Sequence, residues 1–232
     1  MTEITHIVKW TNGSLLQEGS SAQVEELVID TRKVGIPEKA IFIALPTSRR
    51  DGHIFLKDAY DSGIRTFLLQ HTIDVKDFPD ASIIVVPNTV TALQQIAANH
   101  RKQFHIPVIG ITGSNGKTVV KEWLYQLLAD DKEVVKSPRS YNSQIGVPLS
   151  VWLMDPHHEI AIFEAGISQT GEMEKLEQII RPTIGIFTNI GEAHSEGFLN
   201  QRQKVNEKLV LFRHVQKLVY CSDHIDVNEA VL

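Results

Sequence analysis

The stretch VIGITGSNGKTVVKEWLYQLLADD, residues 108–131, decides the fold of this chain. It begins with a short, fully apolar segment, 108–112, of the kind that forms buried strands in parallel sheets. A glycine-rich turn follows, and Lys117 and Thr118 then open an amphipathic helix. Strand, glycine-rich turn and helix in this order predict a nucleotide-binding loop at the carboxyl end of a parallel strand. The apolar face of the helix is expected to consist of Val120, Trp123, Leu124, Leu127 and Leu128.

The turn itself, residues 110–118, has the chemistry of a phosphate loop. Two glycines, Gly113 and Gly116, tolerate backbone angles that other residues resist, so the N–H groups of the loop can converge on phosphate oxygens. The positive N-terminal end of the helix points at the same place. Lys117 is expected to reach the β- and γ-phosphates of ATP, and the Thr118 hydroxyl to ligate Mg²⁺. The predicted ATP-binding residues are Gly113, Ser114, Asn115, Gly116, Lys117 and Thr118.

One departure leaves an alternative open. The general phosphate-loop pattern has an additional glycine at the position of Ile111, so this chain carries only the shorter form G-x-x-G-K-T. A plain glycine-rich turn between a strand and a helix would look the same. The Lys-Thr pair at the start of the helix favours nucleotide binding.

Working outward from the loop, further apolar segments alternate with helical patterns. Towards the C-terminus, three more segments read as buried strands, with helices between them at 171–180 and about 201–213. These strand candidates are 159–166, 183–191 and 217–222. The four strands predict a partial doubly wound P-loop ATP-binding domain over residues 88–232, because such domains usually have five or six.

The first 87 residues predict a smaller α/β domain. Helical spacing of apolar residues over 53–63, ended by Gly63, and strands on either side of it imply βαβ crossovers. The strand candidates are 24–30, 40–46, 66–70 and 82–87, and a helix over 89–104 leads into the second domain.

Composition narrows the class of protein. The 232 residues are 42% hydrophobic with a formal net charge of −5, which gives a real core but lacks the basic footprint of a nucleic-acid-binding protein. A lone cysteine, Cys221, excludes a disulfide framework and, beside Val219 and Tyr220, is more typical of a small core residue than of a nucleophile. The N-terminus does not look like a signal peptide, and no apolar run is long enough for a membrane span. We therefore expect a cytoplasmic protein.

Several motifs resemble one family when they are taken together. T-G-S-N-G-K-T, residues 112–118, is similar to the ATP-binding loop of the Mur ligases and of the folylpolyglutamate synthases. D-T-R-K-V at 30–34 followed by R-R-D-G-H-I-F at 49–55 resembles the uridine-binding module of the Mur ligases, which folylpolyglutamate synthases lack. The other matching stretches, in the order expected for Mur ligases, are YNSQIGVP (141–148), FEAGISQTGEM (163–173) and TNIGEAHSEGF (188–198).

The resemblance covers almost the whole chain and implies an ATP- and Mg²⁺-dependent ligase of peptidoglycan precursor synthesis. The stretch NIGEAHSEGF (189–198) is most like members that add D-alanyl-D-alanine to UDP-N-acetylmuramoyl-tripeptide. Versions of these members that are fused to an alanine racemase are similar to this chain over residues 119–128 and 137–152. The alternatives are a member that adds meso-diaminopimelate or lysine to a UDP-muramyl dipeptide, and a non-catalytic nucleotide-binding module. The family's C-terminal domain, which holds the D-alanyl-D-alanine site, is not in this sequence, so the chain alone is expected to be inactive as a ligase.

The resemblance also implies roles for single residues. Glu164, at the end of a strand, would hold Mg²⁺, although such a residue is also typical of a helix cap or a solvated loop. His194 would serve a second Mg²⁺, which is unusual because this cation prefers oxygen ligands. Lys208, rather than Lys204, would be the lysine that most of the family carbamylates, the alternative being that both are solvated. The implied catalytic residues are Lys117, Glu164, His194 and Lys208.

The resemblance also implies contacts with both ends of the UDP-muramyl peptide substrate. Asn142 and Ser168 would contact the muramyl peptide or phosphate groups, although residues 167–169 depart from the usual Ala-Asn-His. The uridine diphosphate end would be held by Thr31, which replaces the usual Ser, and by Arg32, Asp51 and His53. Turn and cap chemistry is the alternative for each of these residues.

Overall fold

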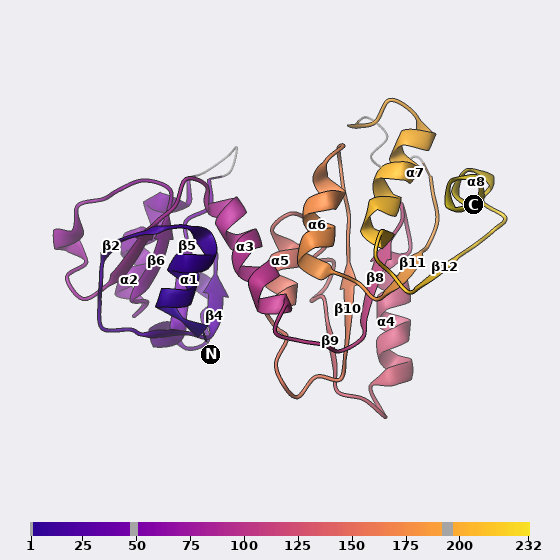
Figure 1. Ribbon diagram of the computed structural model, residues 1–232. Helices are drawn as coiled ribbons and strands as arrows, with labels where there is room; N and C mark the ends of the chain where they lie inside the picture. Colours follow the sequence, from indigo (N-terminus) through magenta and orange to yellow (C-terminus); the bar gives the residue numbers. More distant parts are fainter. Residues whose placement is uncertain (1, 47–50, 192–196) are drawn as a thin grey trace. The chain divides into compact units, whose positions relative to one another are not determined.

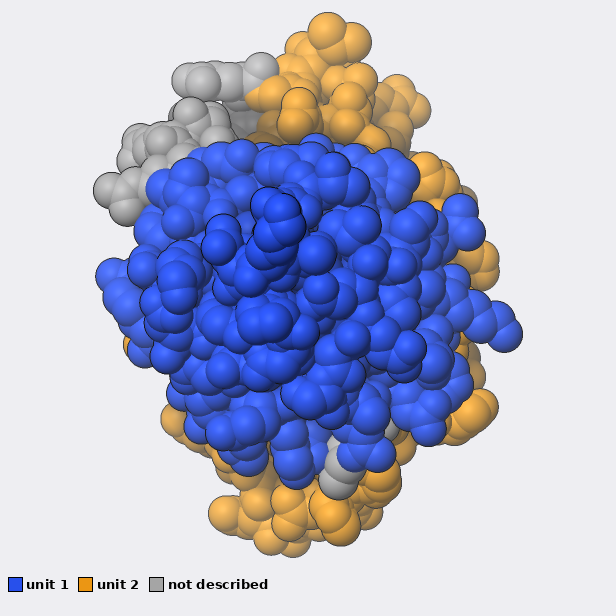
Figure 2. All heavy atoms as spheres, turned by 90° about the vertical axis from the view of Figure 1, so that its left-hand side faces the viewer, with its two compact units in different colours: residues 1–96 blue, residues 97–232 orange. Residues whose placement is uncertain are grey.

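The computed structural model describes residues 2–46, 51–191 and 197–232 (Figure 1). Contacts divide the chain into two compact units, residues 1–96 and 97–232, with the division inside helix α3 (Thr89–Arg101) (Figure 2). Each unit has its own five-stranded sheet with parallel strands, which confirms the α/β fold class. The domain boundary at residues 87 and 88 stays a prediction.

The first sheet has the strand order β2-β7-β6-β5-β4, in which only β2 runs antiparallel to its neighbour. Its strands are β2 (Ser14–Gln17), β4 (Glu26–Val28), β5 (Ala40–Ile43), β6 (Thr66–Leu69) and β7 (Ser82–Val85). The strand predicted over 24–30 is confirmed only for β4; Val24 belongs instead to β3 (Gln23–Val24), which pairs with β1 (Thr2–Glu3), while β4 pairs with β5. Two short strands with different partners replace one long strand.

Helices of the first unit pack short apolar faces onto this sheet. The segment predicted as one helix begins as a 3-10 turn, η3 (Gly52–Phe55), and continues as α2 (Leu56–Asp61), whose Leu56 and Ala59 join the core around Phe42 and Phe67. Helix α1 (Ile4–Thr11) was not predicted; it buries Ile4 and Ile7 and ends at a left-handed Asn12. The remaining 3-10 turns are η1 (Thr31–Lys33), η2 (Pro37–Lys39) and η4 (Val75–Asp77).

The second sheet is parallel throughout and has the order β12-β11-β8-β10-β9. Its strands are β8 (Val108–Thr112), β9 (Val134–Lys136), β10 (Ile160–Glu164), β11 (Ile184–Phe187) and β12 (Lys217–Tyr220). The sequence predicts four strands in this unit, but the described residues form five. The strand that was missed is β9, which has only three residues, one of them a lysine. The helices are α4 (Lys117–Leu128), α5 (Gly146–Val151), α6 (Glu172–Ile180), α7 (Gln201–Leu209), the 3-10 turn η6 (Val210–Phe212) and α8 (Ile225–Val231).

The alternation of side chains along β10 assigns each residue to one face of this sheet. Ala161 and Phe163 pack into the cluster that contains residues of α5 and α6. Ile162 packs on the opposite face with Ile109 and residues of α4. Glu164 has the parity of Ile162, so its side chain lies on the α4 face, directly after the last apolar residue of the strand.

Two predictions about single side chains are wrong. The apolar stripe of α4 is narrower than its sequence suggests, since Val120, Leu124 and Leu128 pack against the sheet, whereas Trp123 is 62% and Leu127 74% exposed. Cys221 is exposed rather than in the core. None of the helices in the described ranges has the length and apolar character required to cross a bilayer.

Candidate functional site

The glycine-rich loop lies where the winding of the second sheet reverses. From β8 the chain moves outward to β9, returns to β10, and then crosses to β11 on the other side of β8. In doubly wound sheets, ligands bind at the carboxyl ends of the strands at such a switch point. Loop 113–116 therefore stands between the carboxyl ends of β10 and β11, the position expected of a ligand site.

Contacts with the segment after β11 fix the shape of the loop. The N–H of Ser114 donates to the Asn189 carbonyl oxygen at 2.9 Å, and the N–H of Asn115 donates to Asn189 Oδ1 at the same distance. Thr188 Oγ1 donates to the Asn115 carbonyl oxygen at 2.6 Å. Gly113 has a φ of +145°, and a Cβ there would stand 2.0 Å from Thr188 Oγ1. Thr188 and Asn189, to which sequence reasoning gave no site role, thus fix the conformation of the loop.

Lys117 folds back over its own loop. Its Nζ donates to the Gly113 carbonyl oxygen at 2.9 Å and lies 3.4 Å from that of Ser114. Burial lowers the pKa of this ammonium, and the nearby Glu164 carboxylate opposes the shift. The left-handed Gly116, with φ +82°, turns the chain into α4 at this point. An ammonium anchored to loop carbonyls is placed to exchange them for phosphate oxygens.

Thr118 and Glu164, predicted as metal ligands from two distant segments, meet at this site. Thr118 Oγ1 donates to Glu164 Oε2 at 3.0 Å, and Asn142 Nδ2 lies 3.5 Å from the same oxygen. Glu164 is fully buried, so the solvated-loop alternative is wrong.

The donor set fits Mg²⁺ held jointly with phosphates, because this cation usually takes one or two carboxylates together with substrate oxygens. A hydroxyl and a carboxylate oxygen, Thr118 Oγ1 and Glu164 Oε2, supply hard ligands at one point. Over residues 2–46, 51–191 and 197–232, no three His, Cys, Asp or Glu side chains cluster closely enough to hold a metal by themselves. His194 lies outside the described residues, and the second metal position stays a prediction.

Lys208 reaches the phosphate loop from α7. Its side chain is buried, and Nζ lies 3.3 Å from the Gly113 carbonyl oxygen. Burial, followed by the charges of Lys117 and Lys204, lowers the pKa of Lys208 to about 7. Lys204 is also buried and donates to the Gly191 carbonyl oxygen at 2.5 Å, so the alternative that both lysines are solvated is wrong.

A cavity of about 370 Å³ opens beside the loop and brings together four of the predicted residues. Lys117 and Lys208 bring positive charge to it, and Asn142 and Ser168 bring polar groups. The Ser168 N–H and hydroxyl both bind Glu172 Oε2, at 2.6 and 3.2 Å, which fixes this rim of the cavity. The size is within the range of small-ligand pockets, and Lys117, together with Lys208 when it is protonated, favours an anionic guest.

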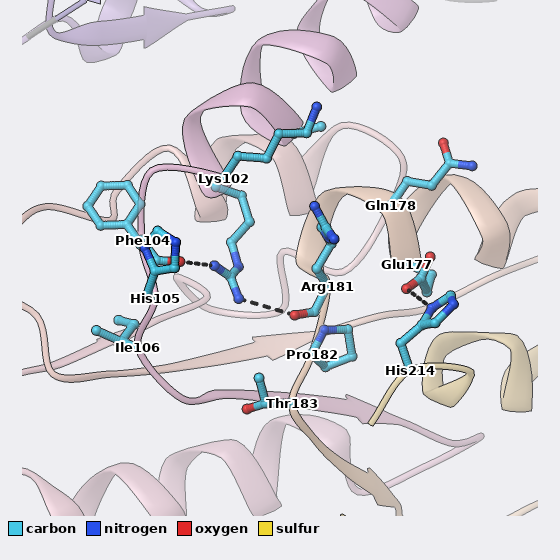
Figure 3. Close-up of a pocket in the computed structure, with 12 residues that line it drawn as sticks. Lys102, Phe104, His105, Ile106, Glu177, Gln178, Arg181, Pro182, Thr183 and His214 are labelled. Atoms are coloured by element: carbon cyan, nitrogen blue, oxygen red, sulfur yellow. Dashed lines mark hydrogen bonds and ion pairs between the residues drawn. The ribbon is translucent and has the colours of Figure 1, made fainter. Parts of the chain in front are cut away.

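A larger cavity, about 800 Å³, lies at the opposite edge of the sheet, before β8 and β11 (Figure 3). Its central cation, Arg101, is already engaged with the carbonyl oxygens of Phe104, Ile180 and Arg181. Figure 3 shows two of these bonds, and Glu177 paired with His214. Because the cavity is far from the carboxyl ends of the strands and its buried cation caps helix ends, we place the chemistry at the smaller cavity.

The predicted uridine-binding residues of the first unit follow the carboxyl ends of β4 and β5. Arg32 forms a double hydrogen bond with Asp30, which holds the pKa of that carboxyl at about 2. His53 Nε2 accepts from the Gln70 N–H at 3.0 Å, so Nδ1 carries the proton and donates to Asp51 at 2.5 Å. Hydrogen bonds from His53 lower the pKa of Asp51, and the His53 ring stacks on His71.

Thr31 lies in η1 beside Arg32. Among the described residues, no hydrogen bond or ion pair joins Thr31 or Arg32 to Asp51 or His53. Contact of these four residues with a uridine diphosphate stays a prediction.

Comparison with known proteins gives the family. Residues 111–228, half of the chain, match the Mur ligase middle domain. The chain belongs to the Mur ligase family. The matched region runs from β8 to α8 and includes the phosphate loop, Glu164 and Lys208.

Curated Mur ligases similar to the chain share a third of its residues. The UDP-N-acetylmuramoyl-tripeptide–D-alanyl-D-alanine ligase of Bacillus subtilis is 32% identical over 228 residues, which cover 95% of this chain and 48% of that protein. The ligase of the same name from Buchnera aphidicola is 37% identical over 188 residues, covering 81% and 40%. The chain thus spans about half the length of the curated relatives that it matches.

Solved structures of Mur ligases share the fold. MurF from Acinetobacter baumannii superposes with a TM-score of 0.85 at 25% identity, over 97% of this chain and 50% of that one. MurF from Thermotoga maritima in complex with ADP gives a TM-score of 0.78 at 28% identity, over 90% and 48%. Both units of the chain therefore have counterparts in MurF structures.

Proposed function

We propose that the protein to which this chain belongs is an ATP-dependent ligase that adds D-alanyl-D-alanine to UDP-N-acetylmuramoyl-tripeptide. The observation that carries the proposal is the meeting of Thr118 with Glu164 at the phosphate loop, beside a cavity lined by Lys117 and Lys208. The relatives named as D-alanyl-D-alanine ligases, and the ADP complex of one MurF, support the choice of nucleotide and substrates.

The reaction begins with transfer of a phosphoryl group. An oxygen of the tripeptide carboxylate attacks the γ-phosphorus of ATP, the bond to the oxygen shared with ADP breaks, and an acyl phosphate forms. Negative charge gathers on the transferred group, so fixed cations and N–H donors around it lower the barrier. Lys117 and the N-terminus of α4 supply these groups on the nucleotide side, and Asn142 on the acceptor side.

The second step forms the new amide bond. The amine of D-alanyl-D-alanine attacks the carbonyl carbon of the acyl phosphate, phosphate leaves with the bridging oxygen, and the amine gives up a proton. The amine site is not assigned to any residue of this chain. We propose that Ser168, Asn142 and the cavity between them hold the acyl end of the muramyl peptide during both steps, while Thr31, Arg32, Asp51 and His53 hold the uridine diphosphate end.

Thr118 and Glu164 would hold Mg²⁺, which when bound withdraws charge from the phosphate oxygens. We further propose that Lys208 is carbamylated. Its neutral amine adds CO₂ to give an N-carboxylate and a proton, which replaces a cation beside Lys117 by an anion. The lowered pKa supports this step, because at pH 7 about half of an amine of pKa about 7 is neutral. This N-carboxylate and His194 would both serve the second Mg²⁺ position.

Titration calorimetry of the 232-residue chain with ADP, with and without Mg²⁺, tests the nucleotide site. We expect binding that strengthens with Mg²⁺ and is lost in Lys117→Met. Lys175→Met is the matched control, because Lys175 is an exposed lysine of α6 away from the loop. Absence of heat with Mg²⁺ and ADP for the unchanged chain would refute the proposal at its first step.

The acceptor is tested in the full-length protein. We expect ATP-dependent product from UDP-N-acetylmuramoyl-tripeptide with D-alanyl-D-alanine, and none from the dipeptide with meso-diaminopimelate. The reverse preference would favour the alternative activity, addition of a diamino acid to the UDP-muramyl dipeptide. A solved ligase of that name is 14% identical to the chain, which shows a shared fold alone. Nucleotide binding without any turnover would favour a non-catalytic module.

A further inference from the structure

We propose that Lys121 is a positioning residue that orients the Glu164 carboxylate for the metal and fixes the 137–142 loop at the acceptor side. The inference rests on the proposed function and extends it to a residue that sequence reasoning missed. Lys121 lies one helical turn after Lys117, between Val120 and Glu122 of α4.

Lys121 is a fully buried lysine whose ammonium is surrounded by oxygens. Nζ donates to the Ser137 carbonyl oxygen at 2.9 Å and to that of Arg139, and it lies 3.0 Å from Glu164 Oε1. Glu122 Oε1 stands 3.1 Å away. Two of the three N–H donors of Lys121 are hydrogen-bonded to carbonyl oxygens, and its charge faces the two carboxylates as ion pairs. The side chain is 0% exposed, which leaves no place for water to share this role.

The two carboxylate oxygens of Glu164 have different partners. Oε1 faces Lys121 as an ion pair, whereas Oε2 accepts from Thr118 at the phosphate loop. A buried carboxylate cannot turn without separating from its cation, which is costly where water is excluded. Lys121 therefore keeps Oε2 directed at the place where metal and phosphates are expected.

The same ammonium ties the acceptor loop to α4. Ser137 Oγ accepts from the Glu164 N–H at 3.2 Å, and Arg139 adopts a left-handed φ of +49°, which is uncommon for a residue other than glycine. The carbonyl oxygens of both residues converge on Lys121. Asn142, three residues further on, then lies 3.5 Å from Glu164 Oε2. One buried lysine thus joins the nucleotide helix, the metal carboxylate and the acceptor loop.

The test measures how much Mg²⁺ strengthens ADP binding to the 232-residue chain, by calorimetry. We expect Lys121→Met to bind ADP without Mg²⁺ as tightly as the unchanged chain does. The factor by which Mg²⁺ tightens ADP binding should be about 10- to 100-fold smaller than in the unchanged chain, the usual effect of removing a partner of a metal ligand. Lys136→Met is the matched control: Lys136 pairs with Glu122 at the same edge of the sheet but does not touch Glu164.

A second variant, Lys121→Gln, keeps N–H donors for the carbonyl oxygens of Ser137 and Arg139 and removes the charge that faces Glu164. We expect it to fold and to show the same loss. An unchanged or larger Mg²⁺-dependent gain in either folded variant would overturn the inference while leaving the proposed function intact. Unfolding of both variants beside a folded Lys136→Met would also overturn it, by making Lys121 only a structural support. No Mg²⁺-dependent gain in the unchanged chain would overturn both proposals.

Discussion

Gly113→Ala should destabilise the second unit more than an alanine at another glycine of positive φ. At φ +145° an alanine is strained whatever space surrounds it, and its Cβ would stand 2.0 Å from Thr188 Oγ1. Thr188 Oγ1 donates its single proton to the Asn115 carbonyl oxygen at 2.6 Å and lies 3.3 Å from that of Thr112, so moving it costs this hydrogen bond. Strain of about 1–3 kcal/mol and one hydrogen bond of about 1 kcal/mol give a loss of about 2–4 kcal/mol.

Gly171→Ala isolates the steric part of this loss. Gly171 also has a positive φ, +80°, but a Cβ there would meet nothing within 4 Å. Both variants place an alanine at a positive φ, but only Gly113→Ala displaces a neighbour, and +145° is further from the left-handed region than +80°. We expect Gly113→Ala to cost at least about 1 kcal/mol more than Gly171→Ala, the value of the displaced hydrogen bond.

Urea unfolding followed by tryptophan fluorescence measures the difference. Of the three tryptophans, Trp10 lies in the first unit, so in a Trp10→Phe background the signal comes from Trp123 and Trp152 in the second. With an m-value of about 2 kcal/mol/M, the midpoint of Gly113→Ala should lie at least about 0.5 M below that of Gly171→Ala. Equal midpoints would refute the argument that the Thr188 contact shapes the loop.

Three further outcomes are expected. Chemical trapping with ¹³C-bicarbonate should label Lys208, and the label should rise as the pH passes upward through about 7, where its amine loses its proton; a label on Lys204 would contradict this assignment. Burial lowers the pKa of His100 below its ordinary value of 6.5, so at lower pH the unfolded state binds more protons than the folded state and stability falls. His100→Gln should therefore flatten the decline of the urea midpoint between pH 7 and 5. Parallel midpoint-against-pH curves for the variant and the unchanged chain would contradict this. Arg101→Met should cost about 3 kcal/mol or more in urea unfolding, because three backbone carbonyl groups lose their donor, whereas the exposed Lys102→Met should cost less than about 0.5 kcal/mol; similar losses would contradict the capping role.

The sequence by itself determined the parts of this protein that are set by local chemistry. Strand, glycine-rich turn and helix over 108–128 follow from a run of apolar residues, two glycines and an amphipathic repeat, each acting on its near neighbours. The α/β class follows from the same alternation repeated along the chain. The family resemblance added that Glu164 and Lys208 belong to the site, and the structure places both against the loop.

Only the tertiary structure decided what depends on partners far away in the chain. β9 holds two valines, which favour strands, but three residues are too few to give a recognisable pattern, and its pairing with β10 makes it a strand of the sheet. Trp123 remains exposed because the stripe of α4 that meets the sheet is narrow. Lys121 looks like any helix lysine until the carbonyl oxygens of Ser137 and Arg139 and the Glu164 carboxylate surround it. Burial and charge pairing arise only when distant segments meet, so the role of a buried lysine cannot be read from its neighbours in the sequence.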